Sequence, residues 1–188
     1  MSQVKWLLDQ VGLKVLDVEL NAVNGGSFSV MAARQESAHA GHPERVNAVL
    51  EQERRRGLGT LKPYQDFRGR VFAHAEELAA MIKEIRARGQ TVLGYGASTK
   101  GNVILQFCGL SEKDIPYIAE VNEEKLGCYT PGTGIPIISE KEARAMRPDY
   151  FLVLPWHFRN GLVAREKAYL QSGGRLIFPL PRIEIVTA

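Results

Sequence analysis

The chain has few cysteines, and their spacing indicates no metal or redox chemistry. Cys108 and Cys128 are the only two cysteines in 188 residues. They form neither a C-x-x-C redox motif nor half of a zinc site, so we expect no bound metal. Two cysteines without a disulfide framework are typical of a reducing compartment, and we expect a cytoplasmic protein.

Long apolar runs and an excess of one charge are also missing. No stretch approaches the roughly 18 apolar residues of a membrane span, and the first residues lack the pattern of a signal peptide. Lys and Arg number 24 against 21 Asp and Glu, which gives a formal net charge of +3. That balance does not favour nucleic-acid binding. We therefore expect neither a membrane nor a nucleic acid as a partner.

The first third of the chain predicts a helix, a strand pair and a helical connector. In "VKWLLDQVG" the apolar residues keep helical spacing, and Gly12 is a natural stop. Residues 14–20 alternate apolar and polar side chains, which predicts a half-buried strand. A turn at "NGG" and a return strand over 27–33 complete a hairpin. We expect residues 1–35 to form this segment and 36–64 a connector whose helix begins at Pro43.

From residue 65 onward the pattern is typical of an α/β domain. A long helix is expected from about Gln65 to Arg88. After it, strands alternate with helices, and Ser139 with Glu142 suits a capping box. Such alternation predicts a Rossmann-like, mostly parallel sheet with helices on both faces over residues 65–188. The expected strands are 91–97, 115–122, 149–156 and 175–181, and the expected helices between them are 100–110, 139–148 and 159–174.

The stretch "GYGASTKGN" (94–102) joins the first of these strands to a helix. It is not a phosphate-binding P-loop, because Lys100 lies between Thr99 and Gly101 rather than before a Ser or Thr. The dinucleotide fingerprint G-x-G-x-x-G would need a glycine where Thr99 stands. Glu120 does occupy the position of the acid that follows about 20 residues later. A methyl-donor site uses a similar loop and acid, so the pattern does not separate the two ligands.

The physical chemistry of this loop favours an anion. Gly94 and Gly96 would let the backbone turn tightly and approach a ligand closely. The following helix N-terminus offers N–H groups and the positive end of a dipole. Lys100 could be an ordinary solvated lysine, but a cation is unfavourable at a helix N-terminus, which favours an anion contact there.

Two further stretches are expected at the same edge of the sheet. "YTPGTGIP" (129–136) and "LPWHF" (154–158) follow the second and third strands. Trp156 and His157 suit either a buried aromatic with a capping imidazole or a surface that stacks and hydrogen-bonds a base or sugar. Tyr95 could line the crevice or pack in the sheet, and "PGTG" could be a locked turn. The candidate binding residues are Gly94, Tyr95, Gly96, Ala97, Ser98, Thr99, Lys100, Gly101, Asn102, Glu120, Asn122, Pro131, Gly132, Thr133, Pro155, Trp156 and His157.

Several motifs together are more specific than any one of them. "GYGASTKGN", "YTPGTGIPI", "PDYFLVLPWHF" and "GGRLIFPLP", in this order and spacing, closely resemble the C-terminal domain of S-adenosylmethionine-dependent sugar C-methyltransferases. "NGGSFSV" near the start extends the resemblance over nearly the whole chain, although residues 40–65 match in pattern only.

The resemblance implies a function for this chain. Those enzymes act on nucleotide-linked keto-sugars in deoxysugar and polysaccharide pathways, and they join a zinc module, a methyl-donor domain and this C-terminal domain. This chain lacks the cysteines that the zinc module would need. It also lacks a second Gly-rich loop, which the methyl-donor domain would need. The segment thought to hold the base would fall before residue 1. The resemblance therefore implies a domain that binds the nucleotide-linked sugar, with the pyrophosphate near Ser98, Thr99, Lys100 and Asn102.

The resemblance also implies what this chain does not do by itself, and other functions remain as alternatives. S-adenosylmethionine would serve the full-length enzyme and is not expected to bind this chain alone, which should bind without catalysing. No residue of the chain is an obvious base, and we do not favour His157. The alternatives are a free-standing nucleotide- or dinucleotide-binding regulator and a protein-interaction module. An apolar hairpin without a partner would favour a homodimer or docking to a methyl-donor domain.

Overall fold

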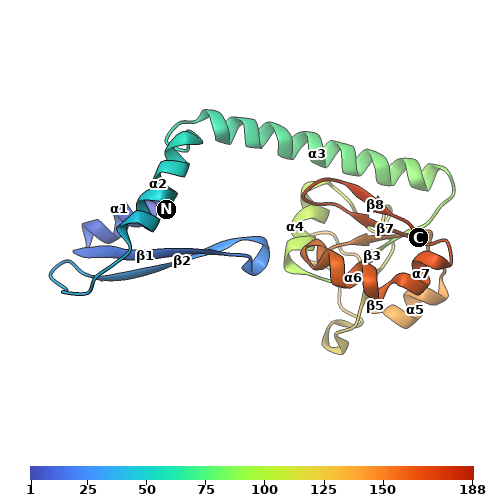
Figure 1. Cartoon of the computed structure of the whole chain (residues 1–188). Helices are drawn as coiled ribbons and strands as arrows, with labels where there is room; N and C mark the ends of the chain where they lie inside the picture. Colours follow the sequence, from blue (N-terminus) through green and yellow to red (C-terminus); the bar gives the residue numbers. More distant parts are fainter. The chain divides into compact units, whose positions relative to one another are not determined.

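The chain folds as two compact units. The computed structural model describes residues 1–188, apart from the side chain of Asn24. The first unit covers residues 1–69 and the second residues 70–188 (Figure 1). Each unit is described by itself below. None of the described helices is long and apolar enough to cross a membrane.

The first unit is an antiparallel strand pair with helices packed on it, as the sequence predicts. Its core is formed by Val18 and Val30, which face each other across the strands, together with Val46 of the second helix. Gly12 ends the first helix with a positive φ of 71°. The elements are α1 (Ser2–Gln10), β1 (Leu13–Asn21), η1 (Val23–Gly25), β2 (Ser27–Arg34) and α2 (Pro43–Arg55).

Helix α3 (Lys62–Ala87) begins earlier than the sequence suggests. The predicted start was Gln65, because Pro63 was taken to lie in a break. Proline lacks the N–H that helix-interior residues donate, but the first turn of a helix does not use that group. Pro63 therefore fits inside the first turn of α3.

The second unit is a six-stranded sheet with helices on both faces, which confirms the predicted fold class. Its strand order is β5-β4-β3-β6-β7-β8, and only β8 runs antiparallel to its neighbour. The strands are β3 (Val92–Tyr95), β4 (Ile118–Glu120), β5 (Ile137–Ser139), β6 (Tyr150–Val153), β7 (Arg175–Phe178) and β8 (Glu184–Val186). The helices after α3 are α4 (Thr99–Phe107), η2 (Glu123–Lys125), α5 (Glu140–Ala145), η3 (Trp156–Phe158), α6 (Arg159–Arg165) and α7 (Lys167–Gln171).

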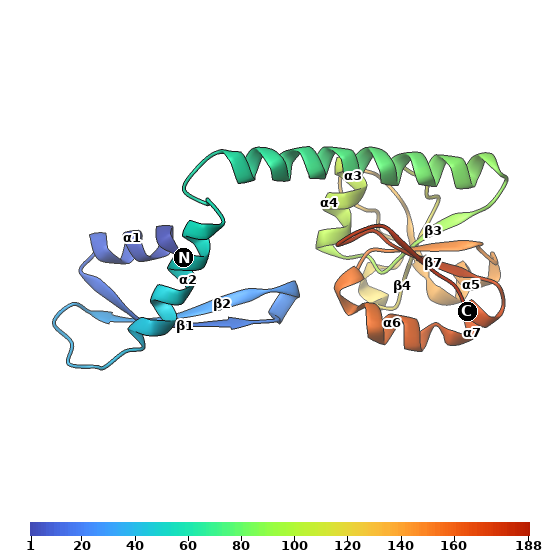
Figure 2. The same cartoon turned by 45° about the horizontal axis from the view of Figure 1, so that its top comes forward.

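Helices cover both faces of this sheet (Figures 1 and 2), and an apolar cluster lies on each face. On one face Leu78 and Ile82 of α3 and Leu105 of α4 pack in one cluster with Leu152. On the other face Ala143 of α5 and Leu170 of α7 pack with Phe151, the neighbour of Leu152 along β6. Successive residues of a strand point to opposite faces, so β6 contributes to both clusters. Burial on both faces explains why its sequence is a continuous apolar run.

Three features differ from the expectation. Strands β5 and β8 were not predicted, because each has only three residues and shows no usable periodicity. The helix expected over 159–174 is broken at Glu166, whose φ and ψ are −90° and 13°. Glu166 is 2% exposed and hydrogen-bonded to Tyr95 and Arg144, so its side chain is held inside the unit at the break.

The topology fixes where a ligand crevice can form. Counted along the chain from β3, the strands lie in the order 3-2-1-4-5-6, so the direction of winding reverses between β3 and β6. In open α/β sheets the loops at such a reversal separate and leave a crevice at the carboxyl ends of the strands. Here those loops are residues 96–98 after β3 and residues 154–158 after β6.

Candidate functional site

Gly96 forms the turn that leads from β3 to α4. Its φ is +80°, a conformation that residues with a side chain rarely adopt. Its N–H donates to the carbonyl of Ala119 at 2.8 Å. A Cβ atom built on Gly96 would lie 2.8 Å from ring carbons of Pro155, so the two crossing loops touch at this glycine. The predicted tight turn is confirmed here.

The other two glycines of the loop serve packing. A Cβ on Gly94 would lie 2.2 Å from Cδ1 of Ile118 in the neighbouring strand, and one on Gly101 would lie 2.5 Å from Cβ of Leu154. The third glycine of a dinucleotide fingerprint permits the same close helix-to-strand packing. In this chain that role falls to residue 101 rather than residue 99.

The N-terminus of α4 opens at the crevice. Ser98 is the N-cap, and its Oγ accepts the N–H of Gly101 at 3.0 Å. The first four N–H groups of an α-helix have no partner within the helix, and they form the positive end of its dipole. Thr99 is exposed and Lys100 half-buried in this first turn. The arrangement suits an anion.

Glu120 is bound to the protein's own backbone. One carboxylate oxygen accepts the N–H of Ala97 at 2.8 Å, and the other accepts those of Val121 and Asn122 at 2.7 and 3.0 Å. Lys125 places its ammonium 3.6 Å from the carboxylate and donates to the carbonyl of Ala97 at 2.8 Å. Burial alone would raise the pKa of Glu120, but these N–H groups and Lys125 hold it below its ordinary value. Glu120 thus fastens the Gly loop to the end of β4.

Asn122 and Tyr95 are likewise occupied within the chain. The side-chain oxygen of Asn122 accepts the N–H of Glu124 and caps η2 at 3.1 Å. Tyr95 is 2% exposed, and its hydroxyl donates to Glu166 at 2.7 Å. Burial and the neighbouring Glu166 raise the pKa of Tyr95. Arg144 donates to both oxygens of Glu166 at 2.8 Å. Tyr95 is therefore part of the floor beneath the crevice.

A cleft of about 260 Å³ lies above this floor. It is formed by the Gly loop, the end of β4, the start of α5, the loop after β6 and helix α6. On its rim Arg165 donates to Glu140 at 2.6 Å, so these opposite charges are paired. The lining residues are Tyr95, Gly96, Ala97, Ser98, Glu120, Val121, Lys125, Glu140, Pro155, Phe158, Leu162 and Arg165.

Trp156 and His157 lie just beyond the cleft. Trp156 is half-buried and packs against the apolar clusters of both sheet faces, which supports the packing interpretation for this residue. The Nδ1 atom of His157 is buried and has no hydrogen-bond partner among the described residues, and the same holds for Oδ1 of Asn102. Burial and the nearby charge of Lys100 lower the pKa of His157, which favours its neutral imidazole.

The "PGTG" turn lies away from the cleft, beside the C-terminal end of α4. The carbonyl of Pro131 accepts a hydrogen bond from Gln106 at 2.8 Å, and Gly132 also packs on this side chain. The hydroxyls of Thr133 and Thr130 are 2.6 Å apart, which locks the turn. Gln106 is in the last turn of α4, about 10 Å along the helix axis from the Gly loop. The expected convergence of Pro131, Gly132 and Thr133 with the loop is not found, because the chain must return here to start β5 parallel to β4.

Some cleft residues were not among the candidates. Val121 and Phe158 directly follow Glu120 and His157, so the motifs could have been extended by one residue to include them. Glu140, Leu162 and Arg165 are far from the Gly loop in sequence, and only the packing of α5 and α6 brings them to it. Among the described residues, no group of three or more His, Cys, Asp or Glu side chains could hold a metal ion.

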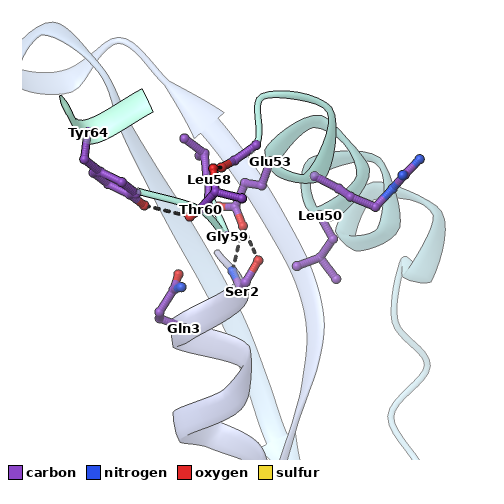
Figure 3. A pocket seen from close by; sticks show the side chains of 10 residues that line it. Ser2, Gln3, Leu50, Glu53, Leu58, Gly59, Thr60 and Tyr64 are labelled. Atoms are coloured by element: carbon purple, nitrogen blue, oxygen red, sulfur yellow. Dashed lines mark hydrogen bonds between the residues drawn. The ribbon is translucent and has the colours of Figure 1, made fainter. Parts of the chain in front are cut away.

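A second pocket lies within the first unit. It has a volume of about 380 Å³ and is bounded by the start of α1, the end of α2 and the 57–64 segment (Figure 3). Its polar groups bond to one another: Ser2 donates its N–H to Glu53 at 2.8 Å, and the hydroxyl of Tyr64 donates to the carbonyl of Leu58 at 2.9 Å. Because these polar groups already bond to one another, they stabilise the contact between α1, α2 and the 57–64 segment. The cleft of the second unit is therefore the stronger candidate for a ligand site.

Comparison with known proteins gives consistent matches. A family model described as the C-methyltransferase C-terminal domain matches residues 22–181. The chain is also 35% identical over 182 residues to the C-methyltransferase NovU of Streptomyces niveus. That alignment covers 97% of this chain and 43% of NovU, so the chain spans less than half the length of this relative.

Proposed function

Because this chain belongs to the family of C-methyltransferase C-terminal domains, we propose that it binds the nucleotide-linked keto-sugar on which such an enzyme acts. One observation carries the proposal. The turn at Gly96 delivers the N-terminus of α4 to the crevice at the reversal of strand order, which is where α/β sheets of this topology bind ligands.

The N-terminus of α4 is the proposed site of the pyrophosphate. The N–H groups of the first turn point toward this end of the helix, and together with the positive end of the helix dipole they favour a negative charge there. Thr99 offers a hydroxyl on the exposed side, and Lys100 adds a full positive charge in the same turn. Ser98, which caps the helix just before Thr99, and Asn102 at its fourth position complete the candidate set. A nucleotide-linked sugar carries its pyrophosphate between base and sugar, so this contact would orient both ends.

The residues of the cleft fit a dinucleotide or S-adenosylmethionine poorly. Sites of this architecture bind the ribose hydroxyls of such ligands through an acid at the end of the second strand. In this chain that acid is Glu120, and both of its oxygens already accept backbone N–H groups. We therefore derive no step through S-adenosylmethionine from these residues, and we propose that the donor binds in another part of the longer enzyme.

The contribution of this chain to the reaction would be binding and orientation. Removal of a proton beside a ketone needs a base within reach. The hydroxyl of Tyr95 is buried against Glu166, and the carboxylate of Glu120 is held by its backbone donors, so neither is available. Burial and the charge of Lys100 lower the pKa of His157, and a neutral imidazole can donate a hydrogen bond to the sugar or phosphate. We propose that methyl transfer requires residues outside this chain.

Substitution of Lys100 tests this proposal. Lys100→Ala should weaken the binding of dTDP-glucose about tenfold or more, because a hydrogen bond to a charged group contributes about 1.5–3 kcal/mol. Isothermal titration calorimetry of the 188-residue chain measures the change. Lys113→Ala is the matched control, since Lys113 is an exposed lysine of the same unit that lies beyond the C-terminal end of α4. Equal affinities of the two variants would contradict the proposed pyrophosphate site.

A further inference from the structure

Two large apolar side chains stand exposed at the rim of the cleft. Val121 is 59% exposed and Phe158 is 62% exposed, and both line the same cavity. They follow β4 and β6, which pair with β3 from its two sides. Neighbouring strands are about 4.8 Å apart, so β4 and β6 are about 10 Å apart. Val121 directly follows β4, and Phe158 ends η3 after β6, so the two side chains reach the cleft from the strands on the two sides of β3.

The floor between them includes Gly96, which has no side chain, the adjacent Pro155 ring and the buried Tyr95. A planar ring that packs against an apolar side chain lies about 3.5 Å from it, which is the distance of carbon atoms in contact.

The backbone on both sides of the cleft is held in place. The N–H of Val121 is bonded to Glu120 at 2.7 Å, and the N–H of Phe158 donates to the carbonyl of Pro155 at 3.0 Å. A surface that is ordered before binding loses little conformational entropy when the ligand arrives.

The charges of the cleft favour an uncharged ring over a phosphate. Lys125 is paired with Glu120 and Arg165 with Glu140, so the cations of the cleft are matched by anions. The side chains of Lys125 and Arg165 are still 44% and 47% exposed. Their remaining N–H groups can donate to carbonyl oxygens on the edge of a base. A pyrophosphate gains more at the N-terminus of α4, where Lys100 lies.

We propose that the cleft between Val121 and Phe158 holds the nucleobase of the nucleotide-linked sugar, stacked on the Phe158 ring. This inference rests on the proposed function and adds which end of the ligand enters the cleft. It assigns to Phe158 the stacking surface that the sequence suggested for Trp156. With the pyrophosphate at α4, the sugar then extends from the Gly loop in the direction away from the cleft.

The test compares the binding of ligands that contain different parts of the nucleotide-linked sugar. Calorimetric titrations of the 188-residue chain are carried out with dTDP-glucose, dTDP, glucose 1-phosphate and inorganic pyrophosphate. Phe158→Ala should weaken the binding of dTDP-glucose and dTDP about tenfold, since it removes the aromatic ring on which the base stacks. Its affinity for pyrophosphate and glucose 1-phosphate should not change. Val121→Ser should have a smaller effect in the same direction.

Two controls keep the outcome interpretable. Ile185→Ala removes a comparably exposed apolar side chain from β8 of the same unit and should bind all four probes as the unaltered chain does. Circular dichroism shows whether Phe158→Ala is folded, and saturation-transfer NMR of the unaltered chain should show the strongest transfer to the protons of the base.

Three outcomes would overturn the inference. If Phe158→Ala leaves dTDP binding unchanged, the base lies elsewhere. If it weakens glucose 1-phosphate instead, the cleft holds the sugar. If the unaltered chain binds neither dTDP-glucose nor dTDP, the proposed function fails together with this inference, which distinguishes that case from the first two.

Discussion

At the scale of single residues, Glu120 binds the protein's own backbone where related nucleotide sites bind a ribose. The sequence places this acid correctly at the end of the second strand of the sheet. Its hydrogen bonds could not be predicted, because the N–H groups of Ala97 and Val121 converge on it only after the Gly loop has folded over β4. A buried carboxylate with several donors stabilises the fold when it is ionised.

Glu120→Gln should therefore destabilise the chain in a pH-dependent way. The pKa of Glu120 is below its ordinary value of 4.5 in the folded chain. A lowered pKa contributes stability above the ordinary value, and this contribution is lost as the pH falls through the folded value. We expect the variant to be less stable by about 2 kcal/mol near pH 7, because its amide replaces a charged acceptor. The difference should shrink as the pH falls below about 4.5.

Urea unfolding across this pH range measures the difference. Glu123→Gln is the control, because Glu123 is an exposed carboxylate in η2, three residues after Glu120. A constant difference between Glu120→Gln and the unaltered chain at all pH values would mean that the ionised carboxylate is not the cause.

At the scale of elements, local patterns predicted most helices and strands. Helix α4, its entry from β3 and the capping box of α5 were all predicted, because caps and glycines act over a few residues. The break at Glu166 was not predicted, because it coincides with a hydrogen bond from Tyr95, 71 residues away in sequence. The position of the "PGTG" turn was also wrong, since the direction of β5 decides it and β5 itself was not predicted.

The hairpin of the first unit leads to a prediction about association. Leu20 and Phe28 face each other across β1 and β2 and are 65% and 45% exposed. Trp6 and Leu7 of α1 are also exposed. Because exposed apolar side chains favour burial, we expect two copies of the chain to associate through this element.

Light scattering measures this association directly. The unaltered chain should have about twice its monomer mass of 20.9 kDa at the highest soluble concentration. Leu20→Glu should shift the mass toward the monomer, whereas Leu61→Glu, at a site of the same unit that is 74% exposed, should not. A monomeric mass for the unaltered chain at every concentration would contradict the prediction.

At the scale of the whole molecule, the alternation of strands and helices was enough to predict the fold class. The Gly loop and the "LPWHF" stretch were correctly expected at one edge, because parallel strands end together. The complete cleft could not be predicted. Glu140 and Arg165 reach it from α5 and α6, and no local pattern records that these helices meet above β3. The packing of α5 and α6 on the sheet brings these residues together, and a local sequence pattern does not predict this packing.

The central claim is that this chain binds a nucleotide-linked sugar rather than a dinucleotide or a methyl donor. The most direct test is a parallel calorimetric titration of the unaltered chain with dTDP-glucose, NAD and S-adenosylmethionine. Since Glu120 is occupied by backbone N–H groups, we expect heat of binding from dTDP-glucose and none from the other two. Binding of NAD or S-adenosylmethionine without binding of dTDP-glucose would contradict the claim and reassign the Gly loop to that ligand.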